Sequence, residues 1–411
     1  NTQYSVLNTL IIDPWATYLG GELADRGYSI AADKLGNAIC TGYTYSVGFP
    51  VIPGAFQMVN MKGNFDVFIT KLDKNGNGIW STFYGGEKTE MGRGIFTDSQ
   101  NNILVTGYTS SLTFPIQSAF QAANNGTMDA FIIKLDPAGT RLWATYFGSA
   151  GADIGWGLIV DWADNVLITG ETFSSGLPTI TGVYQSANAG NSDAFITKFN
   201  SAGNHLWTTY CGGSDFDIGR AIAVDKNNDV IICGTAGVNF PISAGSFQMI
   251  FGGGSKDAFI AKFTPNGAGL WRTYYGGSGI IDYGHDVVAD NNNNIIMIGQ
   301  SSSANLPVPA GAYQNSLSGG ADVFVVKLNS AGNHLWGTYL GGHALDEGYG
   351  VEIDSYENIC IAGDTYNNNF PGIKPCSQTK TLNGLEDQFI GMMTPAGDVI
   401  CISYVGSSGH N

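Results

Sequence analysis

Residues 206–225 read LWTTYCGGSDFDIGRAIAVD, and near-copies of this stretch follow one another along the whole chain. The anchoring tryptophan recurs every 63 to 65 residues, at Trp15, Trp80, Trp143, Trp207, Trp271 and Trp336, with Cys401 in the same position of the last copy. A fixed period of this length indicates a repeat architecture, in which each unit buries its faces against its neighbours. We therefore expect one repeat domain over residues 1–411 rather than two or three globular domains.

Each period contains four short strands. In one copy they are GRAIAVD (219–225), DVIICGT (229–235), DAFIAKF (257–263) and LWRTYYGG (270–277), each bounded by Gly, Asn, Asp or Pro. Bulky residues fall on both sides of the last strand, since Trp271 and Tyr274 point in opposite directions. A four-stranded sheet buried on both faces fits between two other such sheets. The sequence thus predicts an all-β fold of four-stranded blades, the β-propeller arrangement.

Glycine recurs at two fixed places in the period. One glycine ends the second strand and another closes the hairpin before the tryptophan strand. We expect a positive φ or a close backbone approach at both places, because only glycine allows either without steric cost. The two sets are Gly42, Gly107, Gly170, Gly234, Gly299 and Gly363, and Gly76, Gly139, Gly203, Gly267, Gly332 and Gly397.

The segments DAFIIKLDPAG (129–139), FPIQSAFQ (114–121) and AIAVD (221–225) recur in order at constant spacing. This pattern resembles the SBBP family of seven-bladed β-propeller repeats. The resemblance implies an exported, often cell-surface, bacterial protein such as those of Bacteroidetes, without an established common activity and often part of a larger multi-domain protein. The last repeat departs from the pattern, because Met392 replaces a recurring lysine and FPGIKPCSQ (370–378) lacks the aromatic residue before its glutamine.

The chain holds six complete repeats, at about 22–86, 87–149, 150–213, 214–277, 278–342 and 343–407. Aligned backwards by one period, NTQYSVL (1–7) falls on DVFITKL (66–72), so residues 1–21 are expected to supply the third and fourth strands of a half repeat. We expect these strands to close a seventh blade whose two inner strands follow Asn411. Six blades with an extra edge hairpin is the alternative if the mature chain ends there.

The charge balance argues against polyanionic partners. The chain has 34 acidic and 18 basic residues, a formal charge of -16, so we expect neither nucleic-acid binding nor attraction to an anionic membrane. The sequence contains no stretch of about 20 apolar residues, so no membrane insertion is predicted. The chain starts at Asn1 rather than Met, and we expect an extracellular or cell-surface protein whose signal peptide has been removed.

The six cysteines form no C-x-x-C pair, and free or mostly free thiols are expected.

The strongest candidate site is a set of carboxylates, each two residues before the glycine that opens an inner strand. In a propeller they would surround one mouth of the central channel, where they could hold a cation such as Ca²⁺ or the hydroxyls of a sugar. His285 and His343 lie near these loops and break the symmetry. The alternative is that each carboxylate bonds its own loop or the next blade, which their presence in every repeat favours. The predicted carboxylates are Asp25, Glu90, Asp153, Asp217, Asp282 and Asp346.

Other recurring charges are interpreted as structural. Aspartates such as Asp33 should cap the turn after the first strand. Ion pairs between blades could form from two other recurring residues: the aspartate that opens each third strand, such as Asp66, and the lysine five residues later, such as Lys71. DKNGNG (73–78) begins like a calcium loop, but Tyr84 stands where the EF-hand glutamate belongs, so we expect a plain turn. No cofactor is predicted.

Two functions remain open at this stage. The first is a non-enzymatic module that binds a protein or a glycan, or serves as a spacer or adhesin, through variable loop tips such as 122–128 and 250–256. The second is a carbohydrate-active hydrolase or lyase with Asp217 and Asp282 as acid and base. The sequence contains no H-E-x-x-H motif, no G-x-S-x-G elbow, no P-loop and no dinucleotide fingerprint.

Overall fold

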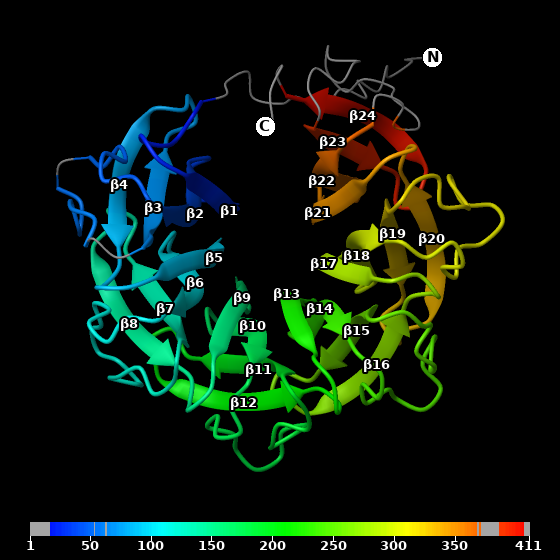
Figure 1. Ribbon diagram of the computed structural model, residues 1–411, viewed down its shortest axis with the longest axis horizontal. Helices are drawn as coiled ribbons and strands as arrows, with labels where there is room; N and C mark the ends of the chain where they lie inside the picture. Colours follow the sequence, from blue (N-terminus) through cyan, green and yellow to red (C-terminus); the bar gives the residue numbers. More distant parts are fainter. Residues whose placement is uncertain (1–16, 53, 62–63, 368–369, 371–385, 407–411) are drawn as a thin grey trace, which may run out of the picture. The chain divides into compact units, whose positions relative to one another are not determined.

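The computed structural model describes residues 17–52, 54–61, 64–367, 370 and 386–406. All regular elements in these residues are β-strands, and they form six four-stranded sheets, each from four consecutive strands (Figure 1). The all-β prediction and the four strands per repeat are confirmed. The described part of the chain contains no apolar helix of membrane-spanning length.

The strands of the first three sheets are β1 (Asp25–Ala32), β2 (Ala38–Thr44), β3 (Asp66–Leu72) and β4 (Gly78–Tyr84); β5 (Glu90–Thr97), β6 (Ile103–Thr109), β7 (Asp129–Leu135) and β8 (Arg141–Phe147); and β9 (Asp153–Val160), β10 (Val166–Thr172), β11 (Asp193–Phe199) and β12 (His205–Cys211). Those of the last three are β13 (Ile218–Val224), β14 (Val230–Ala236), β15 (Asp257–Phe263) and β16 (Gly269–Tyr275); β17 (Asp282–Ala289), β18 (Ile295–Ser301), β19 (Asp322–Leu328) and β20 (His334–Leu340); and β21 (Asp346–Ile353), β22 (Ile359–Thr365), β23 (Asp387–Met393) and β24 (Val399–Val405).

The expected seven blades are wrong, because the described residues form six sheets, the number given as the alternative. The seventh blade was to be built on strands from residues 1–21. Residues 1–16 lie outside the described part of the chain, and residues 17–21 contain no strand. The first sheet takes all four strands from residues 25–84, and the last already has its outer strand, β24, around Cys401. Neither sheet therefore needs strands from the N-terminal segment.

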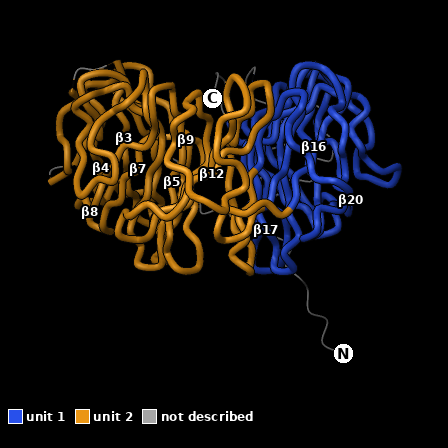
Figure 2. Tube along the Cα trace, turned by 90° about the horizontal axis from the view of Figure 1, so that it is seen from below, with its two compact units in different colours: residues 1–14, 233–262, 271–411 blue, residues 15–232, 263–270 orange. Residues whose placement is uncertain are grey.

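The described chain forms two compact units (Figure 2). Unit 2 contains residues 17–232 and 263–270, and unit 1 contains the remaining described residues from 233 onwards. Within unit 2, the first strands of successive sheets, β1, β5, β9 and β13, lie next to one another, while β4, β8 and β12 lie on the opposite side (Figure 1). Within unit 1, β17 lies next to β21.

The recurring tryptophan joins each sheet to the next. The indole N–H of Trp80 on β4 donates to the carbonyl oxygen of Pro137 at 3.1 Å, in the β7–β8 turn of the following sheet. A Cβ atom on Gly139 in that turn would lie 3.2 Å from the Trp80 ring, and Gly139 has a φ of +87°. The prediction of positive φ or close approach at this glycine is thus confirmed. The same indole bond joins Trp143 to Ser201, Trp207 to Pro265, Trp271 to Ser330 and Trp336 to Pro395.

Close approach, rather than φ alone, requires glycine in these turns. The first hairpin of each sheet has a similar turn, in which Gly36 has a φ of +79° and open space around its Cβ position. In the other five sheets this place is taken, at positive φ, by Asn101, Asp164, Asn228, Asn293 and Glu357. The open space at the Gly36 Cβ position shows why side chains are tolerated in this turn.

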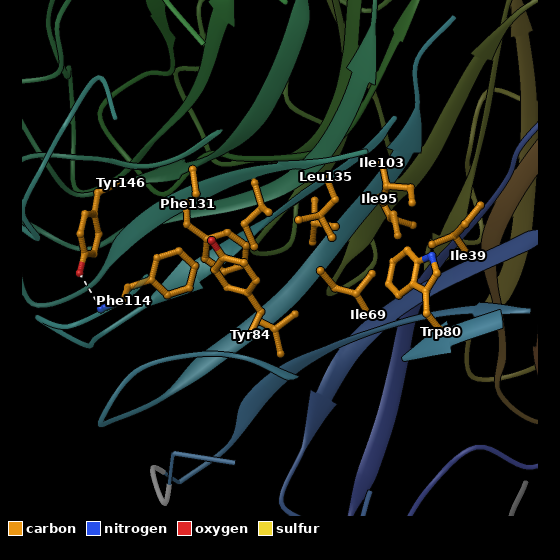
Figure 3. Close-up of a cluster of buried hydrophobic side chains, with 14 residues drawn as sticks. Ile39, Ile69, Trp80, Tyr84, Ile95, Ile103, Phe114, Phe131, Leu135 and Tyr146 are labelled. Carbon is orange, nitrogen blue, oxygen red and sulfur yellow. Dashed lines mark hydrogen bonds between the residues drawn. The ribbon is translucent and has the colours of Figure 1, made fainter. Parts of the chain in front are cut away.

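Apolar side chains fill the space between successive sheets. Between the first two sheets, Ile69 and Trp80 pack in one buried cluster with Ile95 and Leu135 (Figure 3). The Tyr146 hydroxyl accepts a hydrogen bond from the Phe114 N–H at 3.0 Å and donates to the Ser111 carbonyl. These bonds hold the Phe-Pro loop against the sheet.

The ion pairs differ from the prediction. The expected ion pairs were between blades, but Lys71 pairs with Asp33 of its own sheet at 2.9 Å. Its ammonium group also donates to the Pro137 carbonyl of the next sheet. Burial opposes the charged form of Asp33, but hydrogen bonds from Asn37 and Lys71 outweigh it and lower its pKa to about 2. Asp33 also caps its turn, as predicted. The equivalent pairs are Lys134–Asp98, Lys198–Asp161 and Lys327–Asp290.

Two further details concern DKNGNG and the cysteines. Asp73 accepts the backbone N–H groups of Asn75 and Asn77, so its carboxylate caps a hairpin turn. Cys40, Cys211, Cys233 and Cys360 are not disulfide-bonded, whereas Cys401 is. Cys376 lies outside the described residues.

Candidate functional site

The predicted carboxylates lie at the start of the first strand of each sheet, and each accepts a backbone N–H of the loop that leads into that strand. Glu90 is fully buried; its Oε2 accepts the Gly86 N–H at 2.9 Å and its Oε1 the Thr109 hydroxyl at 2.7 Å. Burial raises the pKa of Glu90. Asp153 likewise accepts the Ser149 N–H and the Ser174 hydroxyl. Matching backbone bonds are made to Asp25 by Gly21, to Asp217 by Gly213, to Asp282 by Gly277 and to Asp346 by Gly342.

This geometry favours the structural alternative for these residues. Glu90, Asp153, Asp217, Asp282 and Asp346 are fully buried, while Asp25 is half-buried. A buried carboxylate that accepts donors of its own loop does not face a ligand. Their role in binding stays a prediction. In the part of the chain that the structure describes, no three His, Cys, Asp or Glu side chains come together as a metal site.

Four of these carboxylates, Glu90, Asp153, Asp282 and Asp346, also lie near an aspartate of the preceding sheet. A Cβ on Gly85 would lie 2.5 Å from Asp66 Oδ1 and 2.7 Å from Glu90 Oε2, which places both carboxyl groups beside the same glycine. Burial, reinforced by the charge of Glu90, raises the pKa of Asp66 to about 7. Burial and Asp153 likewise raise the pKa of Asp129 to about 6. Two such groups cannot both ionise without cost, and each pair therefore holds a proton to a higher pH than isolated carboxyl groups do.

The two predicted histidines have different surroundings. His343 is exposed in the loop between β20 and β21. His285 is half-buried on β17, with its ring centroid 5.1 Å from that of Tyr349 on β21 and 5.9 Å from that of Tyr283. His285 therefore belongs to the first-strand face of unit 1 rather than to an exposed loop.

A β-bulge, which the sequence analysis did not identify, interrupts the first strand of five sheets. On β5, Gly92 and Gly94 pair with consecutive residues of β6, and Arg93 between them has no partner in the register. A bulge leaves one residue outside the ladder and re-aims its side chain, and bulges are common beside functional sites. The bulged residues are Tyr28, Arg93, Trp156, His285 and Tyr349.

In unit 2 these positions, with Arg220 at the same place in the repeat, are called the bulge row: Tyr28, Arg93, Trp156 and Arg220. The Arg93 guanidinium carbon lies 4.0 Å from the Tyr28 ring centroid and 4.4 Å from that of Trp156. Arg220 lies 5.2 Å from the Trp156 ring. Arg26, the second residue of β1, lies 5.2 Å from the Tyr28 ring. Guanidinium groups and aromatic rings thus alternate across four neighbouring strands, at cation–π distances.

The bulge row retains unused hydrogen-bond donors. Within the described residues, Arg93 Nε and the Trp156 indole N–H are buried and have no hydrogen-bond partner. Three of the five arginines of the chain, Arg26, Arg93 and Arg220, lie in or beside the row. The sequence did contain a signal for this site, because a constant glycine precedes a residue that changes from Tyr to Arg, Trp or His between repeats.

The comparisons with known proteins agree with the fold. The SBBP model, described as a beta-propeller repeat, matches residues 15–50, 270–307 and 335–371. The chain is 26% identical to an uncharacterized WD repeat-containing protein of Acanthamoeba polyphaga mimivirus, over 48% of this chain and 17% of that protein. It is 25% identical to the regulatory protein FlaEY of Caulobacter vibrioides, over 35% of this chain and 15% of that protein. The matches thus span less than a fifth of the length of these relatives.

Among solved structures, an α-L-arabinanase of Penicillium chrysogenum complexed with arabinobiose aligns with a TM-score of 0.45 and 12% identity. The alignment covers 84% of this chain and 91% of that one. A similarity of this size carries no conclusion about activity.

Proposed function

Because this chain carries SBBP beta-propeller repeats, we propose that it is a non-catalytic binding module whose ligand, a glycan, lies on the bulge row of unit 2. An extracellular or cell-surface location, within a larger protein, belongs to the same proposal. The observation that carries it is the bulge itself. One backbone feature recurs in the first strands, yet its side chains differ from repeat to repeat. A repeated backbone with changing side chains is what a binding site on a symmetric scaffold requires.

The chemistry of the row suits a polar ligand. The arginine guanidinium groups offer N–H donors, and the rings of Tyr28 and Trp156 hold the Arg93 guanidinium in place. Donors that are fixed before binding lose little conformational entropy on complex formation. Sugar hydroxyls accept such hydrogen bonds, and the apolar ring edges remain available to sugar C–H groups.

A glycan fits the row better than an extended peptide. Peptides commonly add to an exposed edge strand through a regular ladder of backbone hydrogen bonds. The first strands β1, β5 and β9 are edge strands of their sheets, but the bulges at Tyr28, Arg93 and Trp156 interrupt the regular ladder there.

The enzymatic alternative receives less support. Asp217 and Asp282, its proposed acid and base, are fully buried. Asp282 accepts the Gly277 N–H and the hydroxyl groups of Ser301 and Ser303. A general acid or base must reach the proton that it transfers. Such enclosed carboxylates are better suited to holding the loop.

A glycan array probed with the whole chain tests the proposal. We expect binding to at least one glycan class, and Trp156→Ala should weaken it at least about tenfold, as for other buried aromatic anchors. Trp162→Ala is the matched control, because Trp162 is 71% exposed on the β9–β10 turn, outside the bulge row. Absence of glycan binding, or equal binding by the wild-type and Trp156→Ala proteins, would contradict the proposal.

A further inference from the structure

We infer that the bulge row selects glycans that carry carboxylate groups, with Arg93 as the residue that contacts the carboxylate. This inference rests on the proposed glycan-binding function and adds the charge of the ligand. It is argued from the environment of Arg93, from the placement of the other arginines and from the overall charge of the chain.

Arg93 is a half-buried cation whose charge no described acidic side chain neutralises. The rings of Tyr28 and Trp156 lie against the guanidinium group, and its hydrogen-bond acceptors are neutral: the Met91 sulfur at 3.6 Å and the Tyr108 hydroxyl. Its Nε is buried without a hydrogen-bond partner. An unpaired buried charge is costly, and a carboxylate that arrives with a ligand removes this cost. Guanidinium edges bind carboxylates through two parallel N–H···O bonds.

Two further arginines lie beside rings on other first strands. Arg26 is exposed on β1 beside Tyr28, and Arg220 is half-buried on β13 beside Trp156. One acid lies close to the row in register: Glu171 of β10 pairs with Ile154 of β9 and accepts the Ser192 hydroxyl at 2.8 Å.

The overall charge limits the size of this ligand. A chain with a formal charge of -16 repels a long polyanion at a distance. A short acidic oligosaccharide experiences less of this repulsion while keeping its contacts with the row. The arginines alternate with rings along the four strands, and a ligand with a carboxylate on successive sugar units matches that alternation.

The test uses the whole chain and oligogalacturonate, with the methyl-esterified oligomer as the uncharged form of the same sugar. We expect binding of the acid form, binding at least about tenfold weaker for the ester, and a similar loss in Arg93→Gln. Arg141→Gln is the matched control, because Arg141 also stacks on a ring, Phe56, at 4.7 Å, but lies outside the row on β8. It should bind as the wild type does.

Three further arms separate the possible explanations. Arg93→Lys keeps the positive charge but cannot form two parallel hydrogen bonds to a carboxylate, so it should bind the acid form more weakly than the wild type does. This variant also tests the inference if Arg93→Gln does not fold. The acid and the ester could bind equally well to the wild type, with binding of both lost in Trp156→Ala. That result would overturn the carboxylate assignment but leave the proposed glycan-binding function standing. Equal or stronger binding of a sulfated oligosaccharide, or binding of poly-glutamate alone, would also overturn the assignment.

Discussion

At the scale of single residues, identical backbone positions have different requirements. Gly139 and Gly36 share a turn conformation, but only Gly139 lies against an indole ring, Trp80. The sequence predicted both possible reasons for glycine, positive φ and close approach, and could not distinguish them at Gly139. The distinction depends on the tryptophan of the preceding sheet, which lies some 60 residues away in the chain.

This difference predicts the effect of two matched substitutions. Gly139→Asn should lower the free energy of unfolding by about 1–3 kcal/mol, as overpacking does, because its Cβ would lie 3.2 Å from the Trp80 ring. Gly36→Asn should change it by less than about 0.5 kcal/mol, since asparagine already occupies the equivalent turns at Asn101 and Asn228. Urea denaturation measures both. Equal losses in the two variants would show that φ, and not the tryptophan contact, requires the glycine.

At the scale of elements, contacts between successive sheets explain most of the recurring charges. The sequence identified the acidic positions but not their neighbours. Asp66 and Lys71 were expected to form ion pairs between blades, yet Asp66 faces Glu90 of the next sheet, and Lys71 pairs with Asp33 of its own sheet. Period and composition show which residues recur, whereas the direction in which a buried side chain points depends on strand register and on the neighbouring sheet. The bulge residue Arg93 was missed for the same reason.

The paired carboxyl groups predict how stability depends on pH. Burial raises the folded-state pKa values of Asp66 and Asp257 to about 7 and that of Asp129 to about 6. Between pH 4 and 7 the folded protein therefore binds more protons than the unfolded chain, and stability falls as the pH rises through this range. Asp33, with a pKa of about 2, has the opposite effect, and its contribution is lost as the pH falls below about 4.

Thermal unfolding between pH 4 and 8 measures this dependence. We expect the melting temperature to fall by several degrees from pH 5 to 7.5, and Asp129→Asn to reduce the fall, because it removes one titrating member of the Asp129–Asp153 pair. Asp136→Asn, at a turn aspartate outside these pairs, is the control and should keep the wild-type slope. A melting temperature that rises over this range would contradict the shared-proton interpretation.

At the scale of the whole molecule, the repeat could be predicted in detail and the number of sheets could not. The predicted strand 257–263 coincides with β15, and the other predicted strands of that repeat differ by one or two residues at their ends. The alignment of residues 1–7 with 66–72 suggested a further half blade, but the described strands already complete six sheets. Net charge likewise gave no information on placement, since three of five arginines lie in or beside one row of an acidic chain.

The central claim is that the recurring carboxylates support the fold and the bulge row binds the ligand. The most direct test measures the dissociation constant for oligogalacturonate and the melting temperature in two variants, Asp153→Ala and Arg93→Gln. We predict that Asp153→Ala melts at a lower temperature but, while folded, binds as the wild type does, and that Arg93→Gln melts near the wild-type temperature but binds at least about tenfold more weakly. Loss of binding in Asp153→Ala at an unchanged melting temperature, with wild-type binding in Arg93→Gln, would contradict it.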